Sequence, residues 1–155
     1  MDYRQKGFTL LEVMLVVVIL SVLAAIAIPR LAGSSDKARE KADIITAREV
    51  KAALDRYEIE NGSYPTKNDF TAENGKITAE NFIPAYISSL DASVTQQAVP
   101  EENQGFGVQT LPSEGEEYSS PTNLIMIYLT EDGSAAEVRV YDKNLNKDSW
   151  LWSSN

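Results

Sequence analysis

The sequence predicts an α+β protein in which one long N-terminal α-helix packs against a small antiparallel β-sheet head. Three observations predict this class. Residues 8–28 are apolar at all but three positions, residues 36–60 carry apolar side chains at spacings of three and four, and residues 124–141 have the pattern of two strands joined by a turn. A chain of 155 residues has room for one globular domain and an appended segment.

The composition excludes several classes of function. The formal net charge is −9, and no cluster of Lys or Arg follows the apolar segment, so we expect no nucleic-acid binding by the head. The sequence has no His and no Cys, which removes the usual general base, thiol chemistry and disulfides. No catalytic array is recognisable, so we expect no enzyme activity, no cofactor and no metal site.

The N-terminal segment has the length of a membrane-spanning helix. Residues 1–7 (MDYRQKG) are short, polar and mildly cationic, and the apolar stretch Phe8–Ile28 follows them. As a helix with a rise of 1.5 Å per residue, this stretch spans about 31 Å, close to the thickness of the hydrocarbon core. The cations in front of it predict a cytoplasmic N-terminus.

A secretory signal peptide is the alternative interpretation of this segment. Its small-residue cleavage site would be Ala25-Ile26-Ala27. Glu12 would then interrupt the start of the apolar region, and Pro29 would lie just beyond the cut. Both residues favour a segment that stays attached to the head.

The start of the segment resembles the processing site of type IV pilins and pseudopilins. The residues that carry the resemblance are KGFTLLE, from Lys6 to Glu12, and the likeness continues through Pro29. It implies the type IV pilin fold and a leader peptide at residues 1–7, which a prepilin peptidase removes by cutting between Gly7 and Phe8. It also implies N-methylation of the new amino terminus on Phe8.

Glu12 is the residue of the apolar segment that most needs an explanation. A carboxylate inside a membrane is costly unless it is neutralised or paired. The resemblance implies that Glu12 pairs with the amino terminus of Phe8 in a neighbouring subunit, which would guide assembly. The alternative is a Glu12 that lies at the headgroup level and has no further role.

Pro29 closes the transmembrane and polymerisation segment predicted at residues 8–29. Because proline has no N–H, we expect a helix break, a kink or local weakening at Pro29, and Gly33-Ser34-Ser35 would add to it. Ser21 falls where many members of the family have Gly, so such weakening would depend more heavily on Pro29.

An amphipathic helix is expected to continue over residues 30–62 and to end at Asn61-Gly62. Two i,i+4 charge pairs are expected on its wet faces, Lys51 with Asp55 and Arg56 with Glu60. The apolar stripe that would pack on the head consists of Ala42, Ile45, Thr46, Val50, Ala53, Leu54 and Tyr57.

The globular α+β head is predicted over residues 63–155. Its clearest signal is a hairpin with one face free to pack on the helix. Val138 and Val140 share one face, and Glu137, Arg139 and Tyr141 share the other. Polar loops are expected at residues 67–76 and at 112–120, the second an acidic, solvated rim. The expected strands cover residues 105–111, 124–129, 136–141 and 150–152.

The segment Asp142–Asp148 places four oxygen-bearing side chains at alternate positions, a spacing that could surround Ca²⁺. An EF-hand loop would require Gly at position 147 and Glu at position 153, where the sequence has Lys and Ser. A polar turn between two strands is therefore the preferred interpretation.

Three functional hypotheses follow. The first is a pilin, a structural subunit that polymerises through its N-terminal helix into a type IV pilus. The alternative is a pseudopilin of a type II secretion or competence system, which is disfavoured because the head lacks the Asp-Pro-Trp-Gly-like stretch common in secretion-type members. The third is a secreted or single-pass anchored binding domain.

The first hypothesis also implies partners and a location. The partners are other copies in a helical filament, the prepilin peptidase, the membrane-bound assembly machinery and, before assembly, the membrane itself. The subunit would span the cytoplasmic membrane once, with its N-terminus inside, and would later lie in an extracellular pilus at the cell surface.

Overall fold

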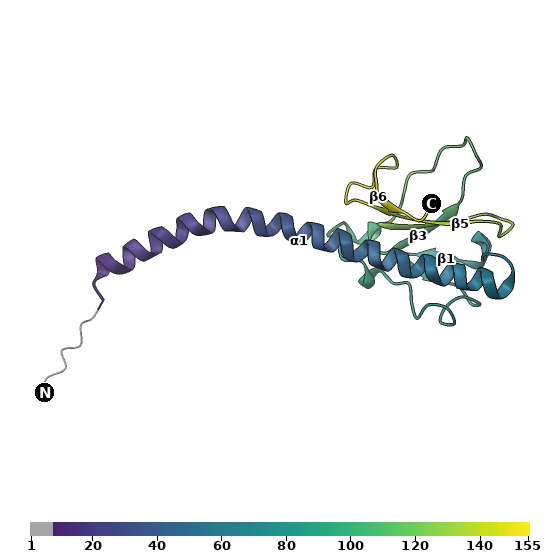
Figure 1. Cartoon of the computed structure of the whole chain (residues 1–155), viewed down its shortest axis with the longest axis horizontal. Helices are drawn as coiled ribbons and strands as arrows, with labels where there is room; N and C mark the ends of the chain where they lie inside the picture. The colour runs from purple at the N-terminus through teal and green to yellow at the C-terminus, as the bar shows by residue number, and fades with distance from the viewer. Residues whose placement is uncertain (1–7) are drawn as a thin grey trace, which may run out of the picture. The chain divides into compact units, whose positions relative to one another are not determined.

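The computed structural model describes residues 8–155, and its main element is one long helix (Figure 1). This helix, α1, runs from Leu10 to Asn61 over 52 residues, so the predicted helix is confirmed in both halves. By its internal contacts the chain divides into two units, Met1–Lys37 and Ala38–Asn155. The leader predicted at residues 1–7, with Gly7, lies outside the described residues.

Within the first unit, the helix continues across Pro29. Pro29 lies inside α1, and Gly33-Ser34-Ser35 are helical as well. Pro29 therefore does not end the helix. Its missing N–H removes one hydrogen bond, to the carbonyl of Ala25, while the turns on either side keep theirs. The local weakening expected at Pro29 stays a prediction.

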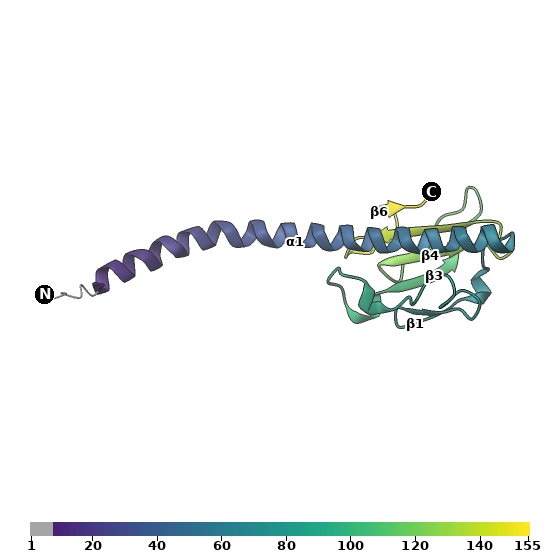
Figure 2. The same ribbon diagram turned by 60° about the horizontal axis from the view of Figure 1, so that its bottom comes forward.

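The second unit contains a four-stranded sheet in the order β3-β4-β5-β6, against which the C-terminal half of α1 packs (Figure 2). The pairs β4–β5 and β5–β6 are antiparallel, whereas β3 and β4 run parallel. The sheet is thus mixed rather than wholly antiparallel, because residues 111–124 form a crossover long enough to bring β4 alongside β3 in the same direction. The strands are β3 (Phe106–Thr110), β4 (Ile125–Leu129), β5 (Ala136–Tyr141) and β6 (Trp150–Ser153).

The core lies between the sheet and one face of α1. In the antiparallel register Ile127 is opposite Val138 and Ile125 is opposite Val140, and all four side chains are fully buried. The prediction that one face of the hairpin packs on the helix is confirmed, and Val138 and Val140 lie on that face. From α1 the buried apolar side chains are Ala47, Val50, Ala53 and Leu54.

The helix presents a slightly different face to the core than the sequence predicted. Ile45, expected in the stripe, is 58% exposed, and Asp43 is fully buried instead. The Asp43 carboxylate accepts hydrogen bonds from the backbone N–H groups of Gln96 (2.6 Å) and Gln97 (3.1 Å). These bonds satisfy the buried carboxylate. They also tie α1 to the coil between two short 3₁₀ helices, η2 (Ala92–Val94) and η3 (Glu101–Asn103).

The two predicted charge pairs of α1 have different outcomes. Lys51 forms its ion pair with Asp55. Arg56 instead donates to the backbone carbonyl of Tyr86, and Glu60 accepts a hydrogen bond of 2.7 Å from the Tyr86 hydroxyl. Tyr86 thus lies between the two charges, so the predicted pair of Arg56 with Glu60 does not form.

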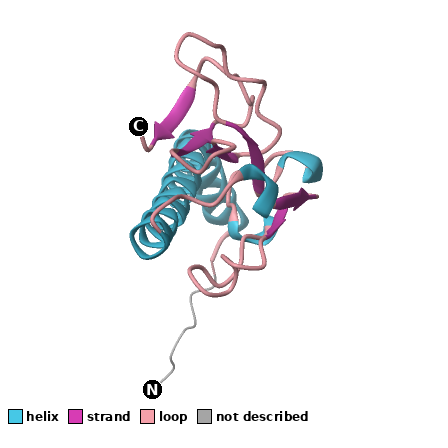
Figure 3. Cartoon of the chain, turned by 90° about the vertical axis from the view of Figure 1, so that its right-hand side faces the viewer, coloured by secondary structure: helices cyan, strands magenta, loops and turns pink. Residues whose placement is uncertain are grey.

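A small hairpin occupies the region that the sequence analysis assigned to a loop (Figure 3). The strands β1 (Thr71–Glu73) and β2 (Lys76–Thr78) pair antiparallel after a short 3₁₀ helix, η1 (Lys67–Asp69). Asn74 and Gly75 form the turn with φ of 50° and 73°. An Asn-Gly dipeptide with positive φ at both positions is typical of two-residue hairpins. The signal was therefore present in the sequence.

The hairpin contacts the main sheet through two glycines. The N–H of Phe106 donates to the carbonyl of Gly75 at 2.9 Å. Gly105 has φ of 76°, and a Cβ placed on it would lie 2.1 Å from the carbonyl oxygen of Gly75. Both the left-handed backbone and the close approach therefore require glycine at position 105.

We expect Gly105→Ala to destabilise the head by more than about 2 kcal/mol, because it adds a backbone clash to the cost of a left-handed residue. The measurement is denaturant unfolding of the full chain in detergent. Gly115→Ala is the matched control, since Gly115 has φ of 92° but open space around the added carbon. Equal losses in the two variants would contradict the close approach at Gly105.

Candidate functional site

The N-terminus of α1 is closed by a reciprocal pair of hydrogen bonds between Thr9 and Glu12. The backbone N–H and the hydroxyl of Thr9 donate to Glu12 Oε2 at 3.1 and 3.2 Å. In return, the N–H of Glu12 donates to Thr9 Oγ1 at 3.2 Å. Because α1 begins at Leu10, Thr9 is the N-cap and Glu12 the third helical residue, which is the arrangement of a capping box.

This geometry gives Glu12 a function within a single chain. It satisfies an N–H group that the first turn of a helix otherwise leaves without a partner, and its negative charge is favourable at a helix N-terminus. Both bonds from Thr9 go to one carboxylate oxygen, so Oε1 lies outside the capping box. The spacing Thr-x-x-Glu was visible in the sequence and could have predicted the cap.

The apolar segment exposes its side chains on every face. The large apolar residues from Phe8 to Leu31 are all at least 51% exposed, and Phe8 is 85% exposed. α1 is long and apolar enough to cross a membrane. The Ser21 hydroxyl donates to the Val18 carbonyl at 2.7 Å, so this polar group is satisfied within the helix. The segment therefore needs lipid or other protein chains to cover it.

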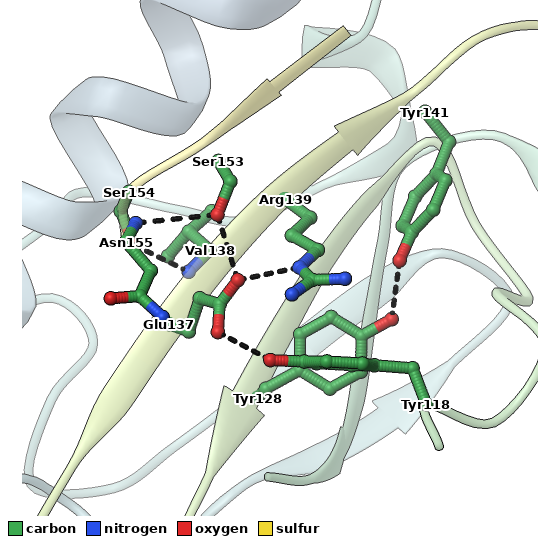
Figure 4. Close-up of polar contacts among 9 residues, drawn as sticks. All are labelled: Tyr118, Tyr128, Glu137, Val138, Arg139, Tyr141, Ser153, Ser154 and Asn155. Carbon is green, nitrogen blue, oxygen red and sulfur yellow. Dashed lines mark hydrogen bonds and ion pairs between the residues drawn. The ribbon is translucent and has the colours of Figure 1, made fainter. Parts of the chain in front are cut away.

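A second cluster of charged residues lies on the face of β5 that points away from α1 (Figure 4). Glu137 accepts hydrogen bonds of 2.7 Å from the hydroxyls of Tyr118 and Ser153 and pairs with Arg139. The Arg139 guanidinium lies 3.5 Å from the centroid of the Tyr118 ring and 4.4 Å from that of Trp150. The sequence placed Glu137 and Arg139 on this face, but the structure shows that the face is covered.

The pKa shifts in this cluster are those expected of a structural contact. Burial alone would raise the pKa of Glu137, but the hydrogen bonds from Tyr118, Arg139 and Ser153 outweigh it and hold the pKa below its usual 4.5. Burial and the bond to Glu137 raise the pKa of Tyr118 to about 12. Glu137 therefore stays ionised and Tyr118 stays protonated at neutral pH, and the cluster fixes Tyr118 and its loop on the sheet.

The segment Asp142–Asp148 forms the preferred polar turn. Asp142 Oδ1 accepts from the N–H of Asn144 at 2.9 Å, and Asn146 Oδ1 accepts from the N–H of Asp148 at 3.0 Å. These side-chain oxygens bind the loop's own backbone. Within residues 8–155, no group of three or more His, Cys, Asp or Glu side chains is arranged to hold a metal ion.

Comparison with known proteins identifies the N-terminal segment. Residues 2–28 match the family described as "Prokaryotic N-terminal methylation motif". The match covers 27 of the 155 residues, so it identifies the N-terminal motif of the chain. The resemblance inferred from the residues around Gly7 and Phe8 is thereby confirmed at the level of the family.

Curated relatives match part of the chain. The chain is 51% identical over 67 residues to the type II secretion system core protein G of Pectobacterium carotovorum subsp. carotovorum, over 41% of each chain. It is 44% identical over 66 residues to that of Dickeya chrysanthemi, over 43% of each chain. It is 43% identical over 65 residues to that of Escherichia coli (strain K12), over 42% of this chain and 45% of the relative.

The match therefore spans less than half the length of these relatives, and no solved structure matches the chain. The expected α+β fold, a long N-terminal helix packed on a small sheet, is confirmed by the structure. The relatives carry the name of the secretion-type alternative rather than that of a surface pilin.

We expect Tyr118→Phe to lower the free energy of unfolding at pH 7 by about 1.5–3 kcal/mol, because it removes a partly buried hydrogen bond to a charged carboxylate. The loss is to be measured by urea unfolding. Since the folded-state pKa of Glu137 lies below 4.5, the difference from wild type should persist down to about pH 4.5 and shrink as Glu137 is protonated below it.

Tyr86→Phe is the matched control for this variant. The Tyr86 hydroxyl also bonds a carboxylate, that of Glu60, but this bond is exposed, so water can replace it. A loss in Tyr86→Phe as large as that in Tyr118→Phe would argue against a special role of the buried cluster.

Proposed function

We propose that this chain is a pseudopilin of a type II secretion system, which assembles through its N-terminal helix into a filament within the cell envelope. The single observation that supports this choice is the identity of 43–51% to type II secretion system core proteins G over 65–67 residues of the chain. This proposal replaces the surface pilus that the sequence favoured. The pilus was favoured because the head lacks an Asp-Pro-Trp-Gly-like stretch.

The exposed apolar helix supports the assembly step of this proposal. In the membrane, acyl chains cover its side chains; once the subunit leaves the membrane, only equivalent helices of other copies can do so. The subunit spans the cytoplasmic membrane once, with its N-terminus inside, before it is incorporated. Its working parts are residues 8–29 as anchor and filament core, 30–62 as the connecting helix and 63–155 as the head.

Cleavage of the leader creates the positive charge that pairs with Glu12. A prepilin peptidase cuts after Gly7 and methylates Phe8, so the mature chain begins with a cationic amine next to the capping box. The carboxylate of Glu12 offers Oε1 to such an amine on a neighbouring copy. Pairing neutralises two charges that are each costly in lipid, which favours assembly and fixes its register.

A subunit of a surface type IV pilus is the second candidate, because of the sequence of the head. The sequence contains no Asp-Pro-Trp-Gly-like stretch. Shearing of surface material followed by electron microscopy separates the candidates, because long surface filaments in a strain without a type II secretion system would favour the pilus.

We expect the mature protein to begin with N-methylated Phe8, which mass spectrometry of the purified chain detects. Gly7→Ala should leave residues 1–7 attached, because the motif that the chain resembles has glycine at the cut. A mature N-terminus at Ile28, after the Ala25-Ile26-Ala27 site, would instead support a secreted domain.

We expect Glu12→Gln to be inserted and cleaved normally but to lower filament yield at least tenfold. Glutamine at the third helical position keeps the capping box, so this variant removes the charge alone. Thr9→Val is the complementary control, because it removes the hydroxyl of the cap and keeps the carboxylate. Wild-type filament yield from Glu12→Gln, measured by shearing and pelleting, would show that Glu12 serves only as a cap.

A further inference from the structure

The part of α1 that belongs to the head has a row of apolar side chains on the face opposite the core. Ala38, Ile45, Ala52 and Ile59 recur at every seventh position, and all four are exposed. Seven residues turn a helix by about 700°, about 20° short of two turns, so the row runs nearly straight along the helix. Ile45 is 58% and Ile59 is 79% exposed. Folding of the head does not use this row.

Two cations and a groove border the row. Lys41 and Arg48 lie along one flank at the same spacing of seven, and both are exposed. On the other flank, a groove of about 420 Å³ opens beside Ala52. Among the described residues, neither Lys41 nor Arg48 has a carboxylate within ion-pair distance. The groove is lined by Glu49, Ala52, Ala53, Arg56, Tyr86, Ile87 and Ser88.

Charge is distributed unevenly between the helix and the rest of the head. Residues 62–155 hold 14 acidic and 5 basic residues, so this part alone has the formal net charge of −9 that the whole chain carries. Its densest acidic stretch is the loop Pro112–Ser120. Glu117 of that loop pairs with Lys147, whereas Glu114 and Glu116 are exposed and have no cation partner among the described residues.

The acidic loop is held in a fixed position by the cluster shown in Figure 4. Tyr118 follows the three glutamates directly, and its hydroxyl is bonded to the buried carboxylate of Glu137. The loop therefore presents Glu114 and Glu116 from an anchored base, which reduces the entropy lost when they bind a partner.

We propose that the helix row, with Lys41 and Arg48 beside it, binds the acidic loop of a second copy of this chain. This inference rests on the proposed function, which it deepens by assigning a contact between heads. The two surfaces are different patches of one molecule, so the contact is heterologous, and a heterologous contact that does not close into a ring produces an open filament. The opposite charges bring the copies together and select the register.

Charge reversal tests the electrostatic part of this contact. We expect Lys41→Glu combined with Arg48→Glu to lower filament yield at least tenfold in cells that process the chain normally. Adding Glu114→Lys and Glu116→Lys to the same chain should restore the yield to within threefold of wild type. Filaments of wild-type yield from the first pair, or no recovery with all four changes, would overturn the inference.

Cysteine cross-linking tests the geometry, because the natural chain contains no Cys. We expect a ladder of oxidised multimers from the chain carrying both Ile45→Cys and Glu114→Cys and none from either single variant. Lys67→Cys with Glu114→Cys is the matched control, since Lys67 is exposed but lies outside the row. A dimer from Ile45→Cys alone would overturn the heterologous contact in favour of a symmetric one.

The two proposals fail in different ways. Wild-type filaments together with no ladder from the paired cysteines would overturn the contact between heads and leave the proposed function standing. If the processed wild-type chain forms no filaments at all, the proposed function fails and the contact fails with it.

Discussion

The rest of this protein depends on one constraint, which is that nothing within the described chain covers the apolar side chains from Phe8 to Leu31. A helix that is apolar all round cannot remain in water, and the satisfied backbone of such a helix suits it equally to lipid and to a bundle of like helices. At the helix N-terminus, the capping box of Thr9 and Glu12 gives hydrogen-bond partners to the N–H groups of both residues. The proposed transfer of the chain from the membrane to a filament rests on this equal fit of the helix to both environments.

The head achieves its stability without disulfides by closing both faces of a short sheet. One face packs on α1 through apolar contacts such as Val138 and Val140. The other face carries Glu137 and Arg139, which are buried and paired with each other, and Glu137 also accepts hydrogen bonds from Tyr118 and Ser153. A buried ion pair of this kind adds little net stability compared with apolar packing, but breaking it leaves a charge without a partner. Its main effect is therefore to hold the covering loops in one place.

The sequence allowed the helix, the main strands and the N-terminal motif to be predicted, because each is a local pattern. Two misses were also local: the Asn74-Gly75 hairpin and the Thr9 cap both had readable signals. Other features could not be predicted from local sequence patterns, because they depend on residues far apart in the chain. The burial of Asp43 depends on amides 53 and 54 residues away, and the covering of Arg139 depends on Tyr118 from a distant loop. The predicted pair of Arg56 with Glu60 does not form because both side chains bind Tyr86 instead.

The bond between Asp43 and the coil at residues 96–97 has a consequence for how the head can vary. The carboxylate binds main-chain amides, so almost any residue except proline could supply the donors at these two positions. What cannot change easily is the spacing, since an inserted or deleted residue would carry an amide out of reach of a buried anion. Related heads should therefore conserve the length of this coil. Their side chains should vary more at the exposed position 96 than at position 97, where the buried Gln97 also donates to the Tyr141 carbonyl at 3.1 Å.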